Sequence, residues 1–358
     1  MKPERWSKIE SIFHKALEAD ESRRSAVIEE SCGGDEELRR EVESLLAHQS
    51  DSASFIEQPA FAGQITTHSA GPVTAADAPR LDLKGVAVGH YQILEEIGVG
   101  GMGQVFRALD TRLHRTVAIK VLPSQHVADP DRKRRFLQEA RAASKLNHPN
   151  IVTLHDMATD GGVDYLVMEY VAGKTLKELI PAEGLPISEA GGYAIQLAGA
   201  LAVAHAAGLI HRDIKPANIM YDPSTDVLKI TDFGIARLTG AGSTRTGIVL
   251  GTPSFMSPEQ LEGRTVTGHS DLFSLGVSLF QLLTGQLPFV ADSMTALMQQ
   301  IAEAPHPPLR AFRPDLPACV ENVIDRALAK NPDARFDSGA QMAAALEDCR
   351  SRVASGLP

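Results

Sequence analysis

Three glycines lie close together in the stretch IGVGGMGQVFRALD, at Gly98, Gly100 and Gly103. The pattern G-x-G-x-x-G lets backbone N–H groups approach phosphates without obstruction from a Cβ atom. By itself it fits a loop for the pyrophosphate of a dinucleotide, a loop for the phosphates of ATP, or a turn that binds nothing. The dinucleotide case requires the loop to open a helix whose N-terminus faces the pyrophosphate. The neighbouring elements therefore decide the chemistry.

Those neighbouring elements are predicted to be strands. YQILEEI enters the loop, QVFRAL alternates like a strand that leaves it, and TVAIKVL forms a third β-rich run after the turn DTRLHR. The glycines are thus expected at the tip of a hairpin, which excludes the dinucleotide interpretation.

A cation is expected close to a phosphate-binding hairpin, and Lys120 in VAIK supplies one from the third strand. A buried ammonium needs a carboxylate partner to stay charged. Glu139, 19 residues further on in the helical stretch RKRRFLQEARAASKL, is the predicted partner.

Further motifs follow in a fixed order. HRDIKPANIM (residues 211–220) resembles the catalytic loop of the eukaryotic-type protein kinases, and TDFG (231–234) resembles their metal-binding turn. GTPSFMSPEQ (251–260) is similar to the end of their activation segment, with Ser-Pro-Glu in place of the usual Ala-Pro-Glu. HSDLFSLGVSLFQLLTG and NPDARF match later landmarks. The chain is identified as a member of the bacterial Hanks-type serine/threonine kinases, whose glycine loop commonly reads G-x-G-G-M-G-x-V.

This resemblance implies Mg²⁺-ATP as cofactor and assigns catalytic roles. Asp213 is the expected acceptor of the substrate hydroxyl's proton, and Lys215 neutralises the γ-phosphoryl group. Asn218 and Asp232 are the expected Mg²⁺ ligands, since a hard cation prefers oxygen ligands beside phosphates.

The resemblance also implies the nucleotide site. Lys120, held by Glu139, grips the α- and β-phosphates, and Met168 is the gatekeeper of the adenine pocket. The residues expected to bind the nucleotide are Ile97, Gly98, Val99, Gly100, Gly101, Met102, Gly103, Gln104, Val105, Ala118, Lys120, Met168, Glu169, Val171 and Met220. Ordinary core packing is the alternative for the apolar members of this set.

The substrate class follows from the same resemblance. Lys215 together with Thr252 indicates transfer to serine and threonine, and the segment 251–260 favours a protein over a small-molecule substrate. A signalling scaffold with a kinase fold, acting by binding through residues 1–48, is the alternative function. It is disfavoured because Lys120, Asp213 and the predicted metal ligands are all present.

Regulation by autophosphorylation, which a homodimer would perform in trans, is expected. Arg212 places a cation beside Asp213, where a phosphate on the activation loop would pair with it. Ser243, Thr244 and Thr246 are the candidate acceptors; their alternative role is only to keep the loop soluble.

Two structural anchors are expected in the larger lobe. Glu259 and Arg335 should form a buried ion pair that ties the activation segment to this lobe. Asp271 should hydrogen-bond the backbone of the catalytic loop.

Composition fits a globular protein of the cytoplasm. The net charge of −10 argues against general affinity for nucleic acid. Three scattered cysteines, Cys32, Cys319 and Cys349, favour a reducing compartment and no disulfide framework. Residues 193–210 have the length of a membrane span, but their alanine content favours a buried core helix.

The predicted architecture is α+β, a bilobal protein-kinase fold with a β-rich N-lobe and a helical C-lobe. A small helical module (residues 1–48), which packs on itself or docks a partner, precedes it. Its expected apolar stripes are Trp6, Ile9, Phe13, Ala16 and Leu17 on one helix, and Leu38, Val42 and Leu45 on a second helix whose expected N-cap is Asp35. A flexible linker (49–90) leads to the kinase domain (91–350), divided into N-lobe (91–167), hinge (168–173) and C-lobe (174–350). Relatives often carry a membrane helix and sensor after the kinase, so a soluble member and a truncated piece both remain open.

Overall fold

The structure is a computed structural model of the 358-residue chain. It describes residues 24–33, 81–100, 103–122, 130–233 and 253–355, with single residues Ile12, Ala16, Asp35, Leu38, Arg39 and Val42. The chain divides into two compact units, Met1–Pro72 and Val73–Pro358, which are described separately below.

The N-terminal unit contains helix α2 (Arg24–Cys32) and a small apolar core. The Asp35 carboxylate accepts a hydrogen bond from the backbone N–H of Leu38 at 3.0 Å, which confirms the predicted N-cap. The predicted stripe residues Trp6, Ile9, Phe13, Leu17 and Leu45 lie outside the described residues. The buried residues that pack together are Ile12, Ala16, Ile28, Cys32, Leu38 and Val42.

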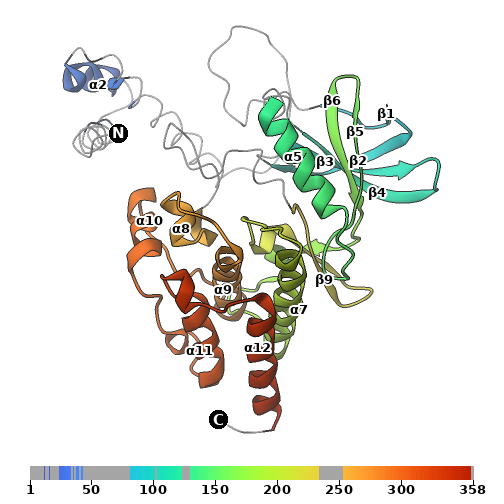
Figure 1. Ribbon diagram of the computed structural model, residues 1–358. Coiled ribbons are helices and arrows are strands. Elements are labelled where there is room, and N and C mark those ends of the chain that lie inside the picture. Colours follow the sequence, from blue (N-terminus) through green and yellow to red (C-terminus); the bar gives the residue numbers. More distant parts are fainter. Residues whose placement is uncertain are drawn as a thin grey trace. The chain divides into compact units, whose positions relative to one another are not determined.

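The second unit begins with an antiparallel sheet of six strands among its described residues, in the order β1-β2-β3-β4-β6-β5 (Figure 1). Gly100 of β2 pairs with Gly103 of β3, so the glycines do lie at a hairpin tip. The strands are β1 (Ala87–Val88), β2 (Tyr91–Gly100), β3 (Gly103–Asp110), β4 (Arg115–Val121), β5 (Leu154–Asp160) and β6 (Val163–Glu169).

Strand β1 lies in the range predicted to be linker. Gly89 donates its N–H to the Asp160 carboxylate at 2.7 Å, and Ile93 donates its N–H to the Val86 carbonyl at 3.0 Å. The expectation of a flexible linker up to residue 90 is therefore wrong for residues 86–90, because strand pairing and these bonds hold them to the sheet.

The sheet has two apolar faces, as the period of two along a strand requires. On β4, Val117, Ile119 and Val121 belong to one cluster with Phe106 of β3. Ala118 belongs to a second cluster on the other face, together with Leu122, Leu166 and Met168. Helix α5 (Pro130–Ala143) follows β4 along the chain and packs against β5.

The C-lobe is built around helices α7 and α9, with α12 and α11 packed against them (Figure 1). Helix α7 is the predicted core helix, which confirms that reading of residues 193–206. Among the described residues, no helix is long and apolar enough to span a membrane. The helices are α6 (Leu176–Leu179), α7 (Ile187–Ala206), α8 (Pro258–Leu261), α9 (Gly268–Thr284), α10 (Met294–Glu303), α11 (Ala318–Ala327) and α12 (Gly339–Ala354).

A small antiparallel sheet lies at the start of this lobe. It consists of β7 (Lys174–Thr175), β8 (Ile219–Asp222) and β9 (Val227–Ile230) in that order. The predicted catalytic loop leads into β8, and the predicted metal-binding turn follows β9. The hairpin of β8 and β9 thus carries both segments.

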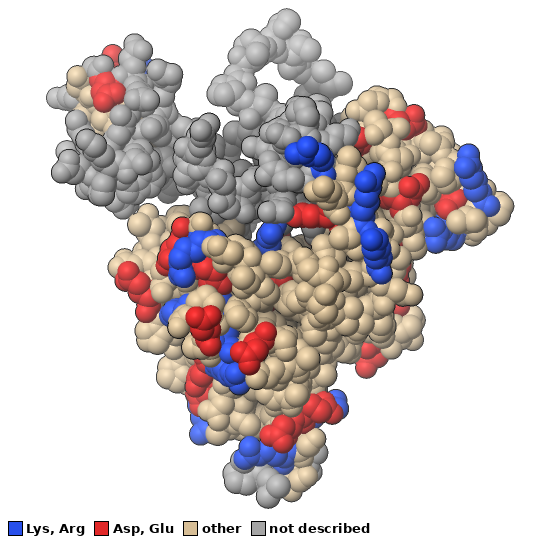
Figure 2. All heavy atoms as spheres, in the orientation of Figure 1, with Lys and Arg blue, Asp and Glu red and all other residues tan. Residues whose placement is uncertain are grey.

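Charged side chains of both signs are interspersed over the described surface of the face in Figure 2.

One prediction about the cysteines is wrong. Cys319 of α11 and Cys349 of α12 form a disulfide, with their Cα atoms 5.6 Å apart. Their sequence separation of 30 gives no spacing signal, because the pairing depends on two helices that meet only after folding.

Candidate active site

The predicted catalytic loop is held by one carboxylate at the start of α9. Asp271 accepts the backbone N–H of His211 at 2.8 Å and that of Arg212 at 2.7 Å. It also contacts Nε2 of His205 at 2.8 Å, and it is fully buried. The predicted anchor by Asp271 is confirmed. The contribution of His205 was missed, although a lone polar residue at the end of an alanine-rich helix was a usable signal.

The backbone is strained at one residue of the catalytic loop and at one residue of the predicted metal-binding turn. Arg212 has a φ of 69° and Asp232 has a φ of 65°. Residues other than glycine rarely adopt this left-handed region, and such strain persists only where surrounding contacts fix it. At Arg212 the fixing contact is the Asp271 hydrogen bond, so the direction of the next residue, Asp213, is set by the core.

Asp213, Lys215 and Asn218 lie together as the sequence predicts. The Asp213 carboxylate is 2.8 Å from Nζ of Lys215 and accepts a hydrogen bond from Nδ2 of Asn218 at 2.8 Å. The same amide nitrogen donates to the Asp213 carbonyl at 2.8 Å. Both bonds use the amide nitrogen, so the amide oxygen is the atom left to coordinate a cation.

Lys120 reaches Asp232 from the sheet. Because residues alternate along β4, Lys120 lies on the same face as Ala118, and it pairs across strands with Val105 and Leu166. Its ammonium is 2.9 Å from Oδ2 of Asp232, and its side chain is buried. The carboxylate offsets part of the cost of removing this ammonium from water.

The predicted ion pair between Lys120 and Glu139 is wrong for this conformation. Among the described residues, Glu139 of α5 pairs instead with Arg212, at 3.7 Å between Oε1 and Nη1. Lys120 pairs with Asp232, a predicted Mg²⁺ ligand, and Arg212, which was predicted to receive a phosphate of the activation loop, takes the predicted partner of Lys120. Spacing along the chain cannot decide between two such pairings, since it does not fix where α5 lies.

The turn after β9 is secured by its neighbours. The His211 ring lies edge-on to Phe233, with centroids 4.7 Å apart, and its Nε2 contacts the Thr231 carbonyl at 2.7 Å. Thr231 donates its N–H to the Asn218 carbonyl at 2.9 Å. The segments that carry the Asp213 and Asp232 carboxylates and the Asn218 amide are therefore joined directly.

Part of the predicted adenine pocket forms a cluster. Ala118 and Met168 pair across β4 and β6, and Val105 packs on the same apolar cluster. Val171 is buried, Met220 on β8 is half-buried, and Ile97 is 44% exposed. Ile97 and Met220 are not members of that cluster.

The glycine loop is described at its two ends. Gly98 pairs with Val105, Val99 with Gln104, and Gly103 has a φ of 116°, which a residue with a side chain rarely adopts. The predicted loop residues Gly101 and Met102 lie outside the described residues.

The Gln104 side chain does not face the nucleotide residues. It lies on the Phe106 side of β3, opposite Val105, because side chains alternate. Its amide donates to the Leu81 carbonyl at 3.2 Å and accepts the Leu81 N–H at 2.9 Å. Only the backbone of Gln104 remains a candidate for nucleotide binding.

Glu169, at the end of β6, has its side chain in a salt bridge that the sequence did not reveal. Nζ of Lys229 lies 2.9 Å from Oε1 of Glu169. The backbone N–H of Glu169 donates a hydrogen bond to the Thr153 carbonyl at 2.9 Å. Lys229 is on β9, so this contact joins the end of the N-lobe sheet to the C-lobe.

The predicted ion pair of Glu259 and Arg335 is confirmed. Arg335 donates two hydrogen bonds to the carboxylate of Glu259, at 2.7 and 2.9 Å, and both side chains are buried. Further donors on Arg335 reach the carbonyls of Ala329 at 2.7 Å, His269 at 3.0 Å and Lys330 at 3.1 Å. The guanidinium is thus fully engaged in one buried network.

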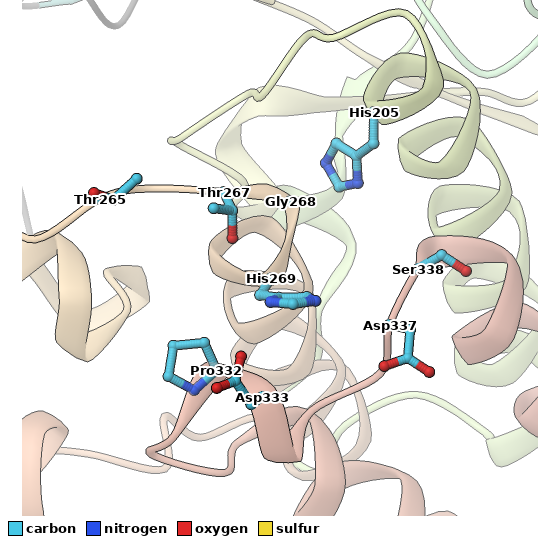
Figure 3. Close-up of a pocket in the computed structure, with 9 residues that line it drawn as sticks. All are labelled: His205, Thr265, Thr267, Gly268, His269, Pro332, Asp333, Asp337 and Ser338. Carbon is cyan, nitrogen blue, oxygen red and sulfur yellow. The ribbon is translucent and has the colours of Figure 1, made fainter.

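A separate cavity of about 430 Å³ lies in the C-lobe (Figure 3). None of its lining residues was predicted to bind nucleotide, metal or substrate. His205 lies in its wall, so the cavity borders the partner of Asp271. The lining residues are His205, Thr265, Thr267, Gly268, His269, Pro332, Asp333, Asp337 and Ser338.

Comparison with known proteins gives consistent results. A family model described as the protein kinase domain matches residues 91–346. The serine/threonine-protein kinase PrkC of Bacillus subtilis is 43% identical over 261 residues, which cover 72% of this chain and 40% of that protein. PknA of Mycobacterium tuberculosis is 44% identical over 271 residues, which cover 74% of this chain and 62% of PknA.

Solved structures agree. The crystal structure of the Mycobacterium tuberculosis PknI kinase domain matches with a TM-score of 0.61 and 32% identity, over 74% of this chain and 98% of that domain. The present chain spans about two fifths of the length of PrkC, so the likeness concerns one domain of that protein.

Proposed function

The chain belongs to the protein kinase family, among the bacterial Hanks-type serine/threonine kinases, and on this basis we propose that it transfers the γ-phosphoryl group of ATP to serine and threonine hydroxyls of proteins. The observation that carries the proposal is the Asp213 carboxylate, 2.8 Å from both the Lys215 ammonium and the Asn218 amide nitrogen. Phosphoryl transfer depends chiefly on positioning and on electrostatic stabilisation of a negatively charged transition state.

The donor set fits Mg²⁺. The Asp232 carboxylate and the Asn218 amide oxygen are hard oxygen ligands, and an ion that keeps several waters needs only one or two protein ligands beside phosphates. When bound, Mg²⁺ supplies positive charge that neutralises the phosphate oxygens. The residues that would hold it are Asn218 and Asp232.

The remaining groups have separate tasks. Asp213 orients the substrate hydroxyl and accepts its proton. Lys215, held beside it, offsets charge on the transferred group. Lys120 carries a buried ammonium that turns from Asp232 to the α- and β-phosphates. Together with the two Mg²⁺ ligands, these roles assign five side chains to the phosphates and the acceptor hydroxyl.

The purine would rest against the apolar face of the sheet. Val105, Ala118 and Met168 supply one wall of the pocket, and the partly exposed Ile97 loses contact with water when the base is bound. Backbone groups of Glu169 and Val171 face the edge of the base.

A labelling assay tests this function. The purified 358-residue chain is incubated with γ-labelled ATP, Mg²⁺ and a generic basic acceptor protein. We expect label on the acceptor and on the chain itself, recovered as phosphoserine and phosphothreonine. Folded protein that labels neither would favour a scaffold that acts by binding. Label on tyrosine alone would contradict the substrate class.

This proposal places the activity of the kinase in the cytoplasm, because its phosphoryl donor is ATP. Its partners are protein substrates, and a second copy of the chain is the partner for trans-autophosphorylation. The helices of residues 1–48 are a candidate docking module.

Autophosphorylation would act through Arg212. Its guanidinium pairs with Glu139 in this conformation, and it is also the cation expected to receive a phosphate from the activation loop. A phosphate carries more charge than a carboxylate, so it would displace Glu139 and release it toward Lys120. Ser243, Thr244 and Thr246, the candidate acceptors, lie outside the described residues.

Replacing Arg212 by alanine should therefore uncouple activity from phosphorylation. For the wild type we expect activity to fall at least about 10-fold after phosphatase treatment, whereas the variant should change less than about 2-fold. The readout is the ratio of initial rates before and after treatment. Arg310→Ala removes an exposed guanidinium that pairs with Glu321, and it should keep the wild-type ratio. An unchanged ratio in Arg212→Ala would place the phosphate elsewhere.

A further inference from the structure

The Cys319–Cys349 disulfide joins the last two helices of the C-lobe. Cys319 lies in the first turn of α11 and is half-buried, whereas Cys349 on α12 is 2% exposed. The Cα atoms are 5.6 Å apart, within the usual range for a disulfide. One sulfur thus belongs to a side chain that solvent reaches, and the other is shielded by the protein.

The segment between the two cysteines makes contacts that attach it to three other elements, α8, α10 and α7. Arg335 binds Glu259 at the end of the activation segment. Lys330 donates to the Ile301 carbonyl at the end of α10 at 2.7 Å. Gly339, at the start of α12, lies so close to α7 that a Cβ atom there would be 2.2 Å from the Ala198 carbonyl oxygen.

The same segment supplies Pro332, Asp333, Asp337 and Ser338 to one wall of the cavity in Figure 3. The segment therefore meets α7 and α9 partly through packed contacts and partly across a cavity that its loop lines on one side. A cross-link between the two helices that begin and end this segment limits how far the loop can open.

The expected redox setting of this bond follows from the proposed function, on which this inference rests. A kinase that uses ATP works in a cytoplasm, where low-molecular-weight thiols keep most cysteines reduced. A pair of cysteines that can bridge in such a setting bridges when an oxidant appears. We propose that Cys319 and Cys349 form a reversible thiol–disulfide pair that stabilises the C-lobe under oxidising conditions.

The oxidant class that fits is a peroxide. The half-buried Cys319 attacks hydrogen peroxide as the thiolate, which gives a sulfenic acid and hydroxide. The thiol of Cys349 then attacks that sulfur, forms the S–S bond and displaces the hydroxyl group, which leaves with a proton as water. Two electrons pass from the two sulfurs to the peroxide. Two molecules of a thiol such as glutathione reverse the reaction and become glutathione disulfide.

The bond should act on stability more than on the catalytic geometry. A cross-link between two helices that already pack together chiefly restricts the unfolded chain, and it does so over the 30-residue separation of the two cysteines. Asp213 and Lys120 lie outside this segment. The oxidised and reduced forms should therefore have similar rates at moderate temperature and different resistance to heat.

The test uses the full chain, either oxidised with hydrogen peroxide or reduced with dithiothreitol. We expect the oxidised form to melt about 5–10 °C higher, as a loop of this length predicts for a domain of this size. Cys319→Ser should melt at the same temperature under both conditions. Cys32→Ser, which keeps the pair, should retain the full difference.

Labelling with a maleimide polymer measures the pair directly. Reduced protein should gain two more labels than oxidised protein, and a glutathione buffer poised as in the cytoplasm should return the oxidised form to the reduced one. Failure of the bond to form with peroxide would overturn the proposal. A bond that survives that buffer would also overturn it, because the pair would then be a permanent cross-link. Neither melting nor labelling requires phosphoryl transfer, so a failed kinase assay leaves both readouts intact.

Discussion

Asp213→Asn is expected to lower the rate of phosphoryl transfer at least about 10³-fold, equivalent to about 4 kcal/mol of transition-state stabilisation. The carboxylate accepts hydrogen bonds from Asn218 and pairs with Lys215, both at 2.8 Å. An amide of the same shape has one oxygen acceptor, turns an N–H₂ group toward one of these donors, and cannot accept the substrate's proton. The rate constant kcat should therefore fall, while KM for ATP stays within about 3-fold, since Asp213 is not among the nucleotide-binding residues.

The matched control is Asp315→Asn. Asp315 is an exposed aspartate that pairs with Arg313, and the variant should keep the wild-type rate. Both variants should melt near the wild-type temperature, which shows that a loss of rate is not a loss of fold. Retention of more than about a tenth of the rate by Asp213→Asn would remove this carboxylate from the reaction.

The second large effect is expected at Arg335. Replacing it by methionine should destabilise the domain by about 4 kcal/mol at pH 7, because Glu259 would stay buried as an uncompensated charge. The carbonyls of Ala329, His269 and Lys330 would lose their donor as well. For a domain of this size the melting temperature should fall by about 10 °C. Unfolding with a chemical denaturant measures the free energy of unfolding of each variant.

The same pair gives the stability a pH dependence with a definite sign. Burial acts to raise the pKa of Glu259, but hydrogen bonds from Arg335 and Ser270 outweigh it and lower the pKa from 4.5 to about 2. The unfolded chain therefore binds a proton more readily than the folded one. The stabilisation, about 3 kcal/mol, is complete above pH 4.5 and is lost as the pH falls toward 2.

Arg350→Met serves as the control on the neighbouring helix. Its guanidinium is half exposed beside Glu347, and exposed pairs of this kind contribute less than about 1 kcal/mol. Arg335→Met should also flatten the loss of stability between pH 4.5 and 2, whereas Arg350→Met should not. Equal effects of the two variants at pH 7 would mean that the buried pair contributes no more than a surface pair.

Motif order predicted the elements around the site well. Hairpin glycines, the helix of residues 193–206 and the anchors at Asp271 and Glu259 follow from patterns that are local or tied to one family. Each depends on a residue that a local motif already restricts, such as Asp271, the acidic residue in the first turn of α9.

Pairings between distant charges could not be predicted in the same way. Glu139 can reach either of two cations, and the choice depends on the position of α5, which no spacing encodes. The Cys319–Cys349 bond was missed for a related reason, since two helices bring the sulfurs together. Strand alternation along β3 predicts the face on which the Gln104 side chain lies. The glycine motif instead assigned Gln104 to the nucleotide-binding loop by its position alone.

The carboxylate of Asp271 connects the catalytic loop to the interior of the C-lobe. The two backbone N–H groups that it holds belong to the same strained turn, and the helix that supplies it is among the most deeply enclosed parts of the domain. The turn therefore cannot relax on its own while that helix keeps its place. Heat inactivation and melting of the lobe should follow a single curve, so that no partly active, loosened form accumulates between them.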